Sequence, residues 1–205
     1  MSTKYQSTLG SLLTALLVGS VPAIYAQIAP ADFKGEPDKT MAAAHESFVK
    51  GEKDKAAAQI DKASAWVKKQ ADKVGEGSKA GMKSAGDELD KLGHGVKDGT
   101  VKSGDELKKS FAKVDHEIAS CWHKTAEDSR KAGKDSTEAL KKAGDGLENA
   151  AKWSGQQLSE STKASVEGLK KAGKATGAGV KAGADEVDKW FKGIGDGIND
   201  LGKKL

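Results

Sequence analysis

The last proline of the chain is Pro37, and this feature narrows the available folds more than any other. All three prolines lie in the first 37 residues, and none occurs from residue 38 to residue 205. A proline-free stretch of this length, rich in Ala, Lys, Glu, Asp and Leu, favours helix throughout. It contains no alternating runs of β-branched residues, so the sequence predicts an all-α fold without strands.

Two short segments share a turn signal in which a glycine ends one helix and an aspartate begins the next. Phe48-Val-Lys-Gly-Glu-Lys-Asp brings an apolar segment to Gly51 and restarts it at Asp54. Arg130-Lys-Ala-Gly-Lys-Asp does the same at Gly133 and Asp135. These are the usual stop and start signals of helices. Each segment therefore predicts two antiparallel helices joined by a tight turn.

Apolar residues recur at spacings of three and four over most of the chain, as in helices that pack at shallow angles. We therefore predict an antiparallel helical bundle over residues 38–172, built from two αα-hairpins, and a C-terminal amphipathic helix over residues 173–205. The hairpins are expected around residues 38–100 and 104–172. Many positions in the apolar stripes are Ala or Gly, which predicts a thin seam of small side chains.

Helix start signals add detail to this prediction. Asp38 is expected to cap the first helix. Ser103 and Glu106 have the spacing of a capping box at the start of the third helix. Asp135, followed by Glu138, has the same spacing at the start of the fourth.

Glycine content and apolar stripes predict the helix interiors. Glycines are dense from residue 75 to residue 104, which predicts a weak or broken helix rather than a free linker. The fourth helix is expected to continue to Leu169, because its apolar stripe does. Small polar residues over 170–179 predict a break before the C-terminal helix.

Residues 1–26 resemble a secretory signal peptide, and residues 27–37 are expected to form an extended segment that leads into the first helix. Lys4 is followed by an apolar stretch from Leu9 to Ile24. This stretch is interrupted by polar residues and is short for a membrane span. The sequence thus predicts an exported protein, in the periplasm or, as an alternative, outside the cell. Cys121 is the single cysteine, so no internal disulfide can form, and a buried thiol is the expected state.

The charge pattern argues against nucleic-acid binding and against catalysis. Of the 34 basic residues only Arg130 is an arginine, the residue that grips phosphate and guanine with two hydrogen bonds. Lysines alternate with Asp and Glu, as on solvated helix faces. Adjacent Asp and Glu residues, which could serve as paired catalytic carboxylates, also recur among lysines as on exposed faces. No nucleophile motif is present. We expect no nucleic-acid partner, no catalytic residues and no bound cofactor.

Histidines supply the only candidate metal site. His116 and His123 are seven residues apart on one predicted helix, too far to share an ion directly, because seven residues span about 10 Å. A third ligand from another helix would be needed, and His45 is the available residue. The sequence therefore offers His45, His116 and His123 as a candidate metal site, with partly buried polar residues as the alternative.

The C-terminal helix has an apolar face that could contact a membrane or another helix. Its polar face carries aspartates and glutamate alongside lysines, whereas a helix on a membrane surface usually carries a basic face. Packing on the bundle or on a partner helix is therefore favoured over membrane contact. The inward-facing residues are expected to be Trp190, Phe191, Ile194, Ile198 and Leu201.

The doubled turn resembles tetratricopeptide-type hairpins and, more closely, the YfdX family of small exported helical proteins. The resemblance covers His45…Phe48-Val-Lys-Gly-Glu-Lys-Asp…Ile60-Asp-Lys-Ala63 and His123…Lys131-Ala-Gly-Lys-Asp…Leu140-Lys-Lys-Ala143. It implies a periplasmic protein tied to stress tolerance or chaperone-like binding. Three functions therefore stay open: a protein- or peptide-binding bundle, a hydration-stress protectant resembling late embryogenesis abundant proteins, and a periplasmic metal-binding protein.

Overall fold

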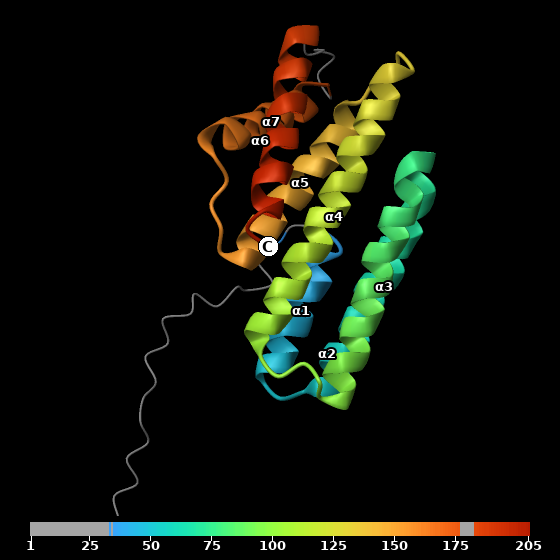
Figure 1. Ribbon diagram of the computed structural model, residues 1–205, viewed down its shortest axis with the longest axis vertical. Helices are drawn as coiled ribbons and strands as arrows, with labels where there is room; N and C mark the ends of the chain where they lie inside the picture. The colour runs from blue at the N-terminus through green and yellow to red at the C-terminus, as the bar shows by residue number, and fades with distance from the viewer. Residues whose placement is uncertain (1–32, 34, 177–182) are drawn as a thin grey trace, which may run out of the picture.

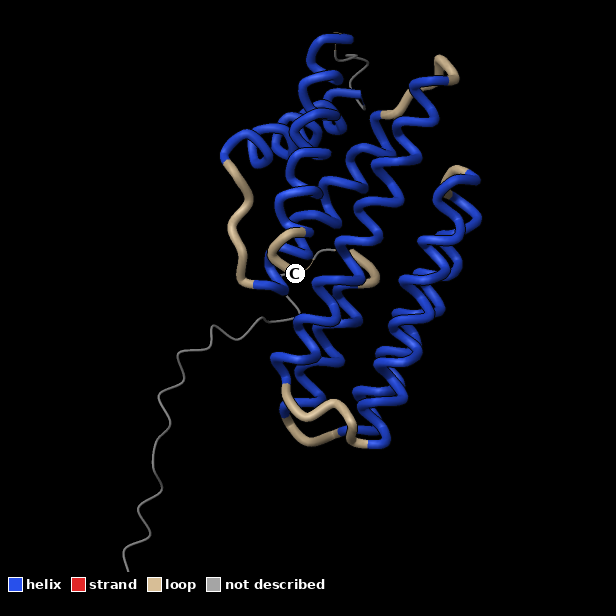
Figure 2. Tube along the Cα trace, viewed as in Figure 1, coloured by secondary structure: helices blue, strands red, loops and turns tan. Residues whose placement is uncertain are grey.

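A computed structural model describes residue 33, residues 35–176 and residues 183–205. The predicted signal peptide and most of the predicted lead-in lie outside these residues. The described part is all-α, as predicted, and contains no strand (Figure 2). Its helices are α1 (Asp38–Val49), α2 (Lys53–Gln70), the 3-10 helix η2 (Ala71–Lys73), α3 (Glu76–Asp98), α4 (Gly104–Lys131), α5 (Thr137–Ser154), α6 (Glu160–Thr176) and α7 (Ala184–Gly202).

The longest helix, α4, runs through the middle of the bundle (Figure 1). The antiparallel pair of α2 and α3 packs along one side of it, and α5 packs along another. Helix α1 lies against α2 and α4, whereas α6 and α7 pack on each other and on α5. Helix α7 also contacts α4, so the two predicted hairpins and the C-terminal helix form one bundle.

Both predicted turns are confirmed. Gly51 and Gly133 adopt the left-handed conformation, with φ of 80° and 68°. After Gly51 the amide of Glu52 donates to the carbonyl oxygen of Ser47 at 2.9 Å, and the second turn contains the equivalent bond at 2.8 Å. This is the pattern of a Schellman motif, which satisfies the last carbonyl groups of a helix. The chain therefore reverses direction at both glycines, as predicted.

The prediction of a weak or broken helix over 75–104 is wrong, because α3 is one continuous helix of 23 residues. Its glycines allow close approach to α2 rather than breaks. A Cβ atom at Gly86 would lie 2.5 Å from Cγ of Lys68, and one at Gly93 would lie 2.7 Å from Oδ1 of Asp61. The cost of glycine in a helix is about 1 kcal/mol per residue, and packing against a neighbouring helix can offset it.

The prediction of one fourth helix extending to Leu169 is also wrong. Helix α5 ends at Ser154, because Gly155 adopts a left-handed conformation with φ of 66°. A short loop follows, and the hydroxyl of Ser159 accepts a hydrogen bond from the amide of Thr162 at 3.3 Å at the start of α6. The predicted break over 170–179 is wrong for residues 170–176, because α6 continues to Thr176, and the rest of that range lies outside the described residues.

The predicted caps have mixed outcomes. At the start of α4 the amide of Glu106 donates to Oγ of Ser103 at 3.2 Å, as a capping box requires. The predicted box at α5 does not form. Oδ1 of Asp135 instead accepts from the amide of Thr137 at 2.8 Å, and Glu138 lies 3.7 Å from a lysine of its own helix. A local turn at the aspartate therefore replaces the box.

The chain before α1 differs from the predicted extended lead-in. Residues 35–37 form a turn, in which the amide of Lys39 donates to the carbonyl oxygen of Gly35 at 2.9 Å. Asp38 is the first residue of α1, and the helix start has no side-chain cap. The predicted capping role of Asp38 is therefore wrong, because its carboxylate is buried and bonded to α5, as described below.

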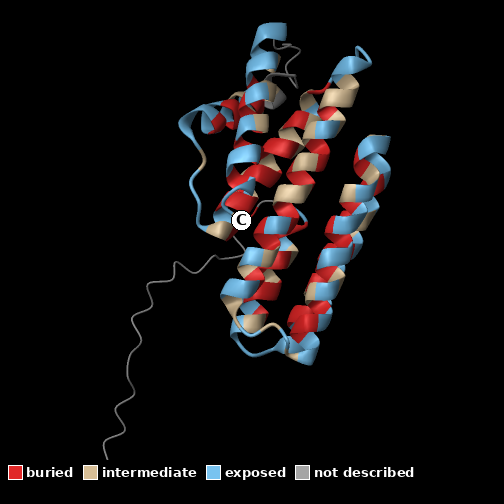
Figure 3. Cartoon of the chain, viewed as in Figure 1, coloured by how far each residue is buried: buried red, intermediate tan, exposed pale blue. Residues whose placement is uncertain are grey.

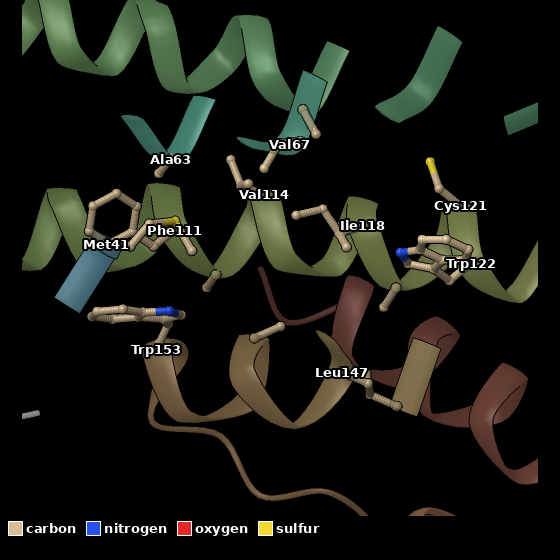
Figure 4. Close-up of a cluster of buried hydrophobic side chains, with 14 of the residues drawn as sticks. Met41, Ala63, Val67, Phe111, Val114, Ile118, Cys121, Trp122, Leu147 and Trp153 are labelled. Atoms are coloured by element: carbon tan, nitrogen blue, oxygen red, sulfur yellow. The ribbon is translucent and has the colours of Figure 1, made fainter. Parts of the chain in front are cut away.

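Buried residues line the inner faces of the helices, and exposed residues face outward (Figure 3). The core combines a few large side chains with many small ones, and Figure 4 shows Met41, Phe111 and Trp153 gathered where α1, α4 and α5 meet. The predicted seam of small residues is clearest between α4 and α5. A Cβ atom at Gly146 would lie 3.3 Å from the backbone nitrogen of Ala119.

The C-terminal helix is amphipathic and packs on the bundle. Trp190, Ile194, Ile198 and Leu201 are buried, and Phe191 is half-buried against the core. Their contacts are with α4, α5 and α6, so the expected apolar face covers part of this molecule. In the described part of the chain, no helix combines the length and the hydropathy that crossing a membrane would require.

Candidate functional site

Trp153, in the last turn of α5, is the centre of an aromatic cluster. Its ring stacks on Phe33, with 4.6 Å between the ring centroids, and packs at a tilt on Phe111 at 5.0 Å. The imidazole of His45 lies 6.2 Å from the same ring. The side chain is 2% exposed. Trp153 therefore joins the chain before α1 to α1, α4 and α5.

The indole nitrogen of Trp153 binds a buried carboxylate. Nε1 donates to Oδ1 of Asp38 at 3.1 Å, and Nδ2 of Asn149 donates to Oδ2 of the same residue at 2.7 Å. Asp38 also lies in the first turn of α1, where the helix dipole favours a negative charge. Two donors and the end of a helix thus compensate for the burial of this carboxylate.

A second carboxyl group, that of Asp115 on α4, lies against Asp38. Asp115 is 1% exposed, and its Oδ2 is buried without a hydrogen-bond partner. Burial and the adjacent Asp38 together hold the pKa of Asp115 well above its ordinary value. Burial also raises the pKa of Asp38, although its contacts with Asp115, Trp153 and Asn149 act in the opposite direction.

Trp153 also lines a pocket of about 420 Å3. The pocket lies between the start of α4, the end of α5 and the last residues of the chain. Four of its lining residues are lysines and one is an aspartate: Lys108, Lys109, Lys152, Lys204 and Asp105. A volume of this size is in the range that binds ligands in other proteins, and the excess of lysine favours an anionic ligand.

A smaller cavity of about 140 Å3 lies next to the pocket, because Lys204 belongs to the walls of both. Its other walls come from the loop before α6 and from the polar and small residues where α6 meets α7. Thr162 and Gly197 are among them. Two adjacent cavities can hold an extended ligand better than a single small ion.

The structure does not bring the three candidate metal ligands together. Nε2 of His116 bonds the carbonyl oxygen of Ile198 at 2.8 Å, and Nε2 of His123 bonds that of Phe191 at 3.1 Å. His45 lies at the α1–α4 contact, where burial and Lys108 lower its pKa. Within the described ranges, no group of three or more His, Cys, Asp or Glu residues is arranged to hold a metal ion.

The single cysteine is buried, as expected. Cys121 is 5% exposed on α4, and its sulfur lies 3.9 Å from Oε1 of Glu117. Burial and this carboxylate raise the pKa of the thiol to about 12, so the side chain stays protonated at neutral pH. It therefore belongs to the packing of the bundle and not to the pocket.

Sequence reasoning missed the buried carboxyl pair and the pocket. One signal for the pair was present, since Asp115 falls four residues after Phe111 and three before Ile118, within the apolar stripe of α4.

A search of protein-family models, of curated proteins and of solved structures found no match. The resemblance to YfdX proteins therefore stays a prediction.

Proposed function

We propose that this chain is a non-enzymatic binding protein whose lysine-lined pocket takes an acidic segment of a protein or peptide. The observation that supports this most is the pocket of about 420 Å3 beside Trp153, with four lysines and one aspartate in its wall. Lys109 and Lys204 are exposed, so their charges are accessible to a partner. Lysine at this density favours carboxylates of the partner over its basic residues.

The shape of the site favours a peptide over a small anion. The adjoining cavity that shares Lys204 lengthens the accessible surface, and Trp153 and Leu205 give the pocket an apolar part. An acidic segment could place its carboxylates on the lysines and an apolar side chain against this part. The proposal includes export and a chaperone-like or stress-related role, which are supported by the N-terminal sequence and the family resemblance.

A fluorescence titration with two peptides of equal length tests this proposal. We expect a glutamate-rich peptide to change the tryptophan emission at micromolar concentration and a lysine-rich peptide to leave it unchanged. Binding should weaken as salt is added, since exposed charges are screened within about 8 Å at physiological ionic strength. Equal responses to both peptides, or none, would contradict the proposal.

A matched pair of charge reversals localises the binding. The double substitution Lys109→Glu with Lys204→Glu changes the pocket, whereas Lys83→Glu with Lys97→Glu changes exposed lysines of α3 by the same net charge. We expect the first pair to weaken peptide binding at least tenfold and the second to weaken it less than twofold. Competition by inorganic phosphate at the same concentration as the peptide would reassign the pocket to small anions.

A further inference from the structure

The buried pair of Asp38 and Asp115 presents a hydrogen-bonding problem that the protein must solve. Ionised carboxylates only accept hydrogen bonds, so two of them in contact cannot bond to each other. Asp38 already accepts from Trp153 and from Asn149 on its two oxygens. Oδ2 of Asp115, by contrast, is fully buried and has no donor within reach. A buried polar atom without a partner is costly and rare in native proteins.

We infer that Asp38 and Asp115 form a buried proton-binding site, in which Asp115 carries a proton and donates it to the Asp38 carboxylate. This arrangement gives Oδ2 of Asp115 a role as donor and leaves Asp38 as an acceptor for three groups. It also leaves one negative charge at the site instead of two. That charge lies in the first turn of α1, where the helix dipole stabilises it.

The charged groups around the pair do not offer another way to compensate for the burial of the Asp115 carboxyl group. On α1 the neighbouring titratable group is His45, whose own pKa is lowered by burial. On α4, Lys108 acts on His45, and on α5, Lys152 lies over the ring of Phe33 at 5.3 Å from its centroid. Within the described part of the chain, no cation is among the groups that shift the pKa of Asp115. A proton is therefore the ligand that fits the site.

This site links folding to pH independently of the ligand proposed for the pocket. The folded chain holds a proton on Asp115 at pH values where the unfolded chain has released it. The pKa of Asp115 is raised on folding, so its stabilising effect is complete below the unfolded value of 3.8 and is lost as pH rises through the folded value. Between the two values, the unfolding constant should rise about tenfold per pH unit.

Infrared spectroscopy of the folded protein tests the inference directly. At pH 7 we expect a carbonyl stretching band of a protonated carboxylic acid, which shifts on exchange into deuterated water. The band should disappear in Asp115→Asn and remain in Asp87→Asn, a control at an exposed aspartate of α3. Absence of the band from the wild type, or its persistence in Asp115→Asn, would overturn the inference.

The pH dependence of unfolding provides the second measurement. An asparagine at position 115 keeps the shape and donates through its amide without titrating. We expect Asp115→Asn to lose the tenfold rise per pH unit and to be more resistant to unfolding at high pH than the wild type. If the two proteins show the same pH dependence, no proton is held between these residues. If the variant does not fold, the presence or absence of the infrared band in the wild type tests whether a proton is held between these residues.

Discussion

His116 donates a hydrogen bond from Nε2 to the carbonyl oxygen of Ile198, at 2.8 Å. One heptad later on α4, His123 makes the same bond to Phe191 at 3.1 Å. A carbonyl oxygen only accepts, so each imidazole carries its proton on Nε2. Because α7 lies antiparallel to α4, two bonds seven residues apart on both helices fix the register of α7.

Glycines on α7 make room for these imidazoles. A Cβ atom at Gly202 would lie 2.8 Å from Nε2 of His116, and one at Gly195 would lie 3.2 Å from Nε2 of His123. The two histidines that the sequence suggested as metal ligands thus act as helix-docking residues in the folded chain. Their spacing of seven was recognised from the sequence, but their partners on α7 were not.

Loss of either histidine should weaken the docking of α7. We expect His116→Ala and His123→Ala each to lower the free energy of unfolding by about 1–2 kcal/mol, through the hydrogen bond and the packing lost. Urea unfolding followed by circular dichroism measures this. His94→Ala, at an exposed position of α3, should change stability by less than about 0.5 kcal/mol. An equal effect of all three substitutions would contradict the role in docking.

His123 should also make the bundle less stable in mild acid. Burial lowers the pKa of His123 below its ordinary value of 6.5, against the opposing effects of the Phe191 carbonyl and Glu127. The folded state therefore binds this proton less well than the unfolded state, and stability is lost as pH falls below 6.5. The melting temperature of wild type minus that of His123→Gln should fall between pH 7 and pH 5. A constant difference would contradict this assignment.

Close contacts at glycines between α6 and α7 should make Gly197→Ala destabilising. A Cβ atom at Gly197 would lie 2.5 Å from Cγ2 of Thr162 and 2.7 Å from Cδ2 of Leu147. Overpacking of this kind costs about 1–3 kcal/mol, which exceeds the gain of about 1 kcal/mol from alanine in a helix. Gly77→Ala, where the nearest atom would be 3.6 Å away, should be neutral or stabilising. Urea denaturation of both variants provides the comparison.

The thiol of Cys121 should react only after unfolding. Its pKa of about 12 and its burial keep it protonated and inaccessible at pH 8. We expect a disulfide reagent to modify the folded protein at least a hundredfold more slowly than the protein in urea. Rapid reaction of the folded protein would mean that the contact between α3 and α4 at Gly81, next to the sulfur, opens readily.

The sequence predicted the turns better than the helix interiors, for a physical reason. Gly51 and Gly133 adopt left-handed conformations that are nearly specific to glycine, so a local signal was sufficient. Gly155 also adopts a left-handed conformation, but no aspartate follows it, and the apolar stripe continues beyond it at Leu158. In α3 the glycines favoured a break, because nothing in a single sequence shows that Lys68 needs the space at Gly86.

The sequence did not predict the candidate site, for a different physical reason. Asp38 and Asp115 are far apart in a sequence in which acidic residues are common on exposed faces. Only the position of Asp115 inside an apolar stripe distinguished it. The pocket depends on how the start of α4, the end of α5 and the region of Lys204 come together, and no local pattern predicts such an arrangement.

A thermal melt, followed together by far-ultraviolet and near-ultraviolet circular dichroism, tests most directly whether the helices share one packed core. We predict a single sigmoidal transition with the same midpoint in both signals, because Trp122, Trp153 and Trp190 are buried among the same helices that give the far-ultraviolet signal. A weak helical signal that changes without a cooperative transition would contradict the packed bundle and favour the hydration-stress protectant.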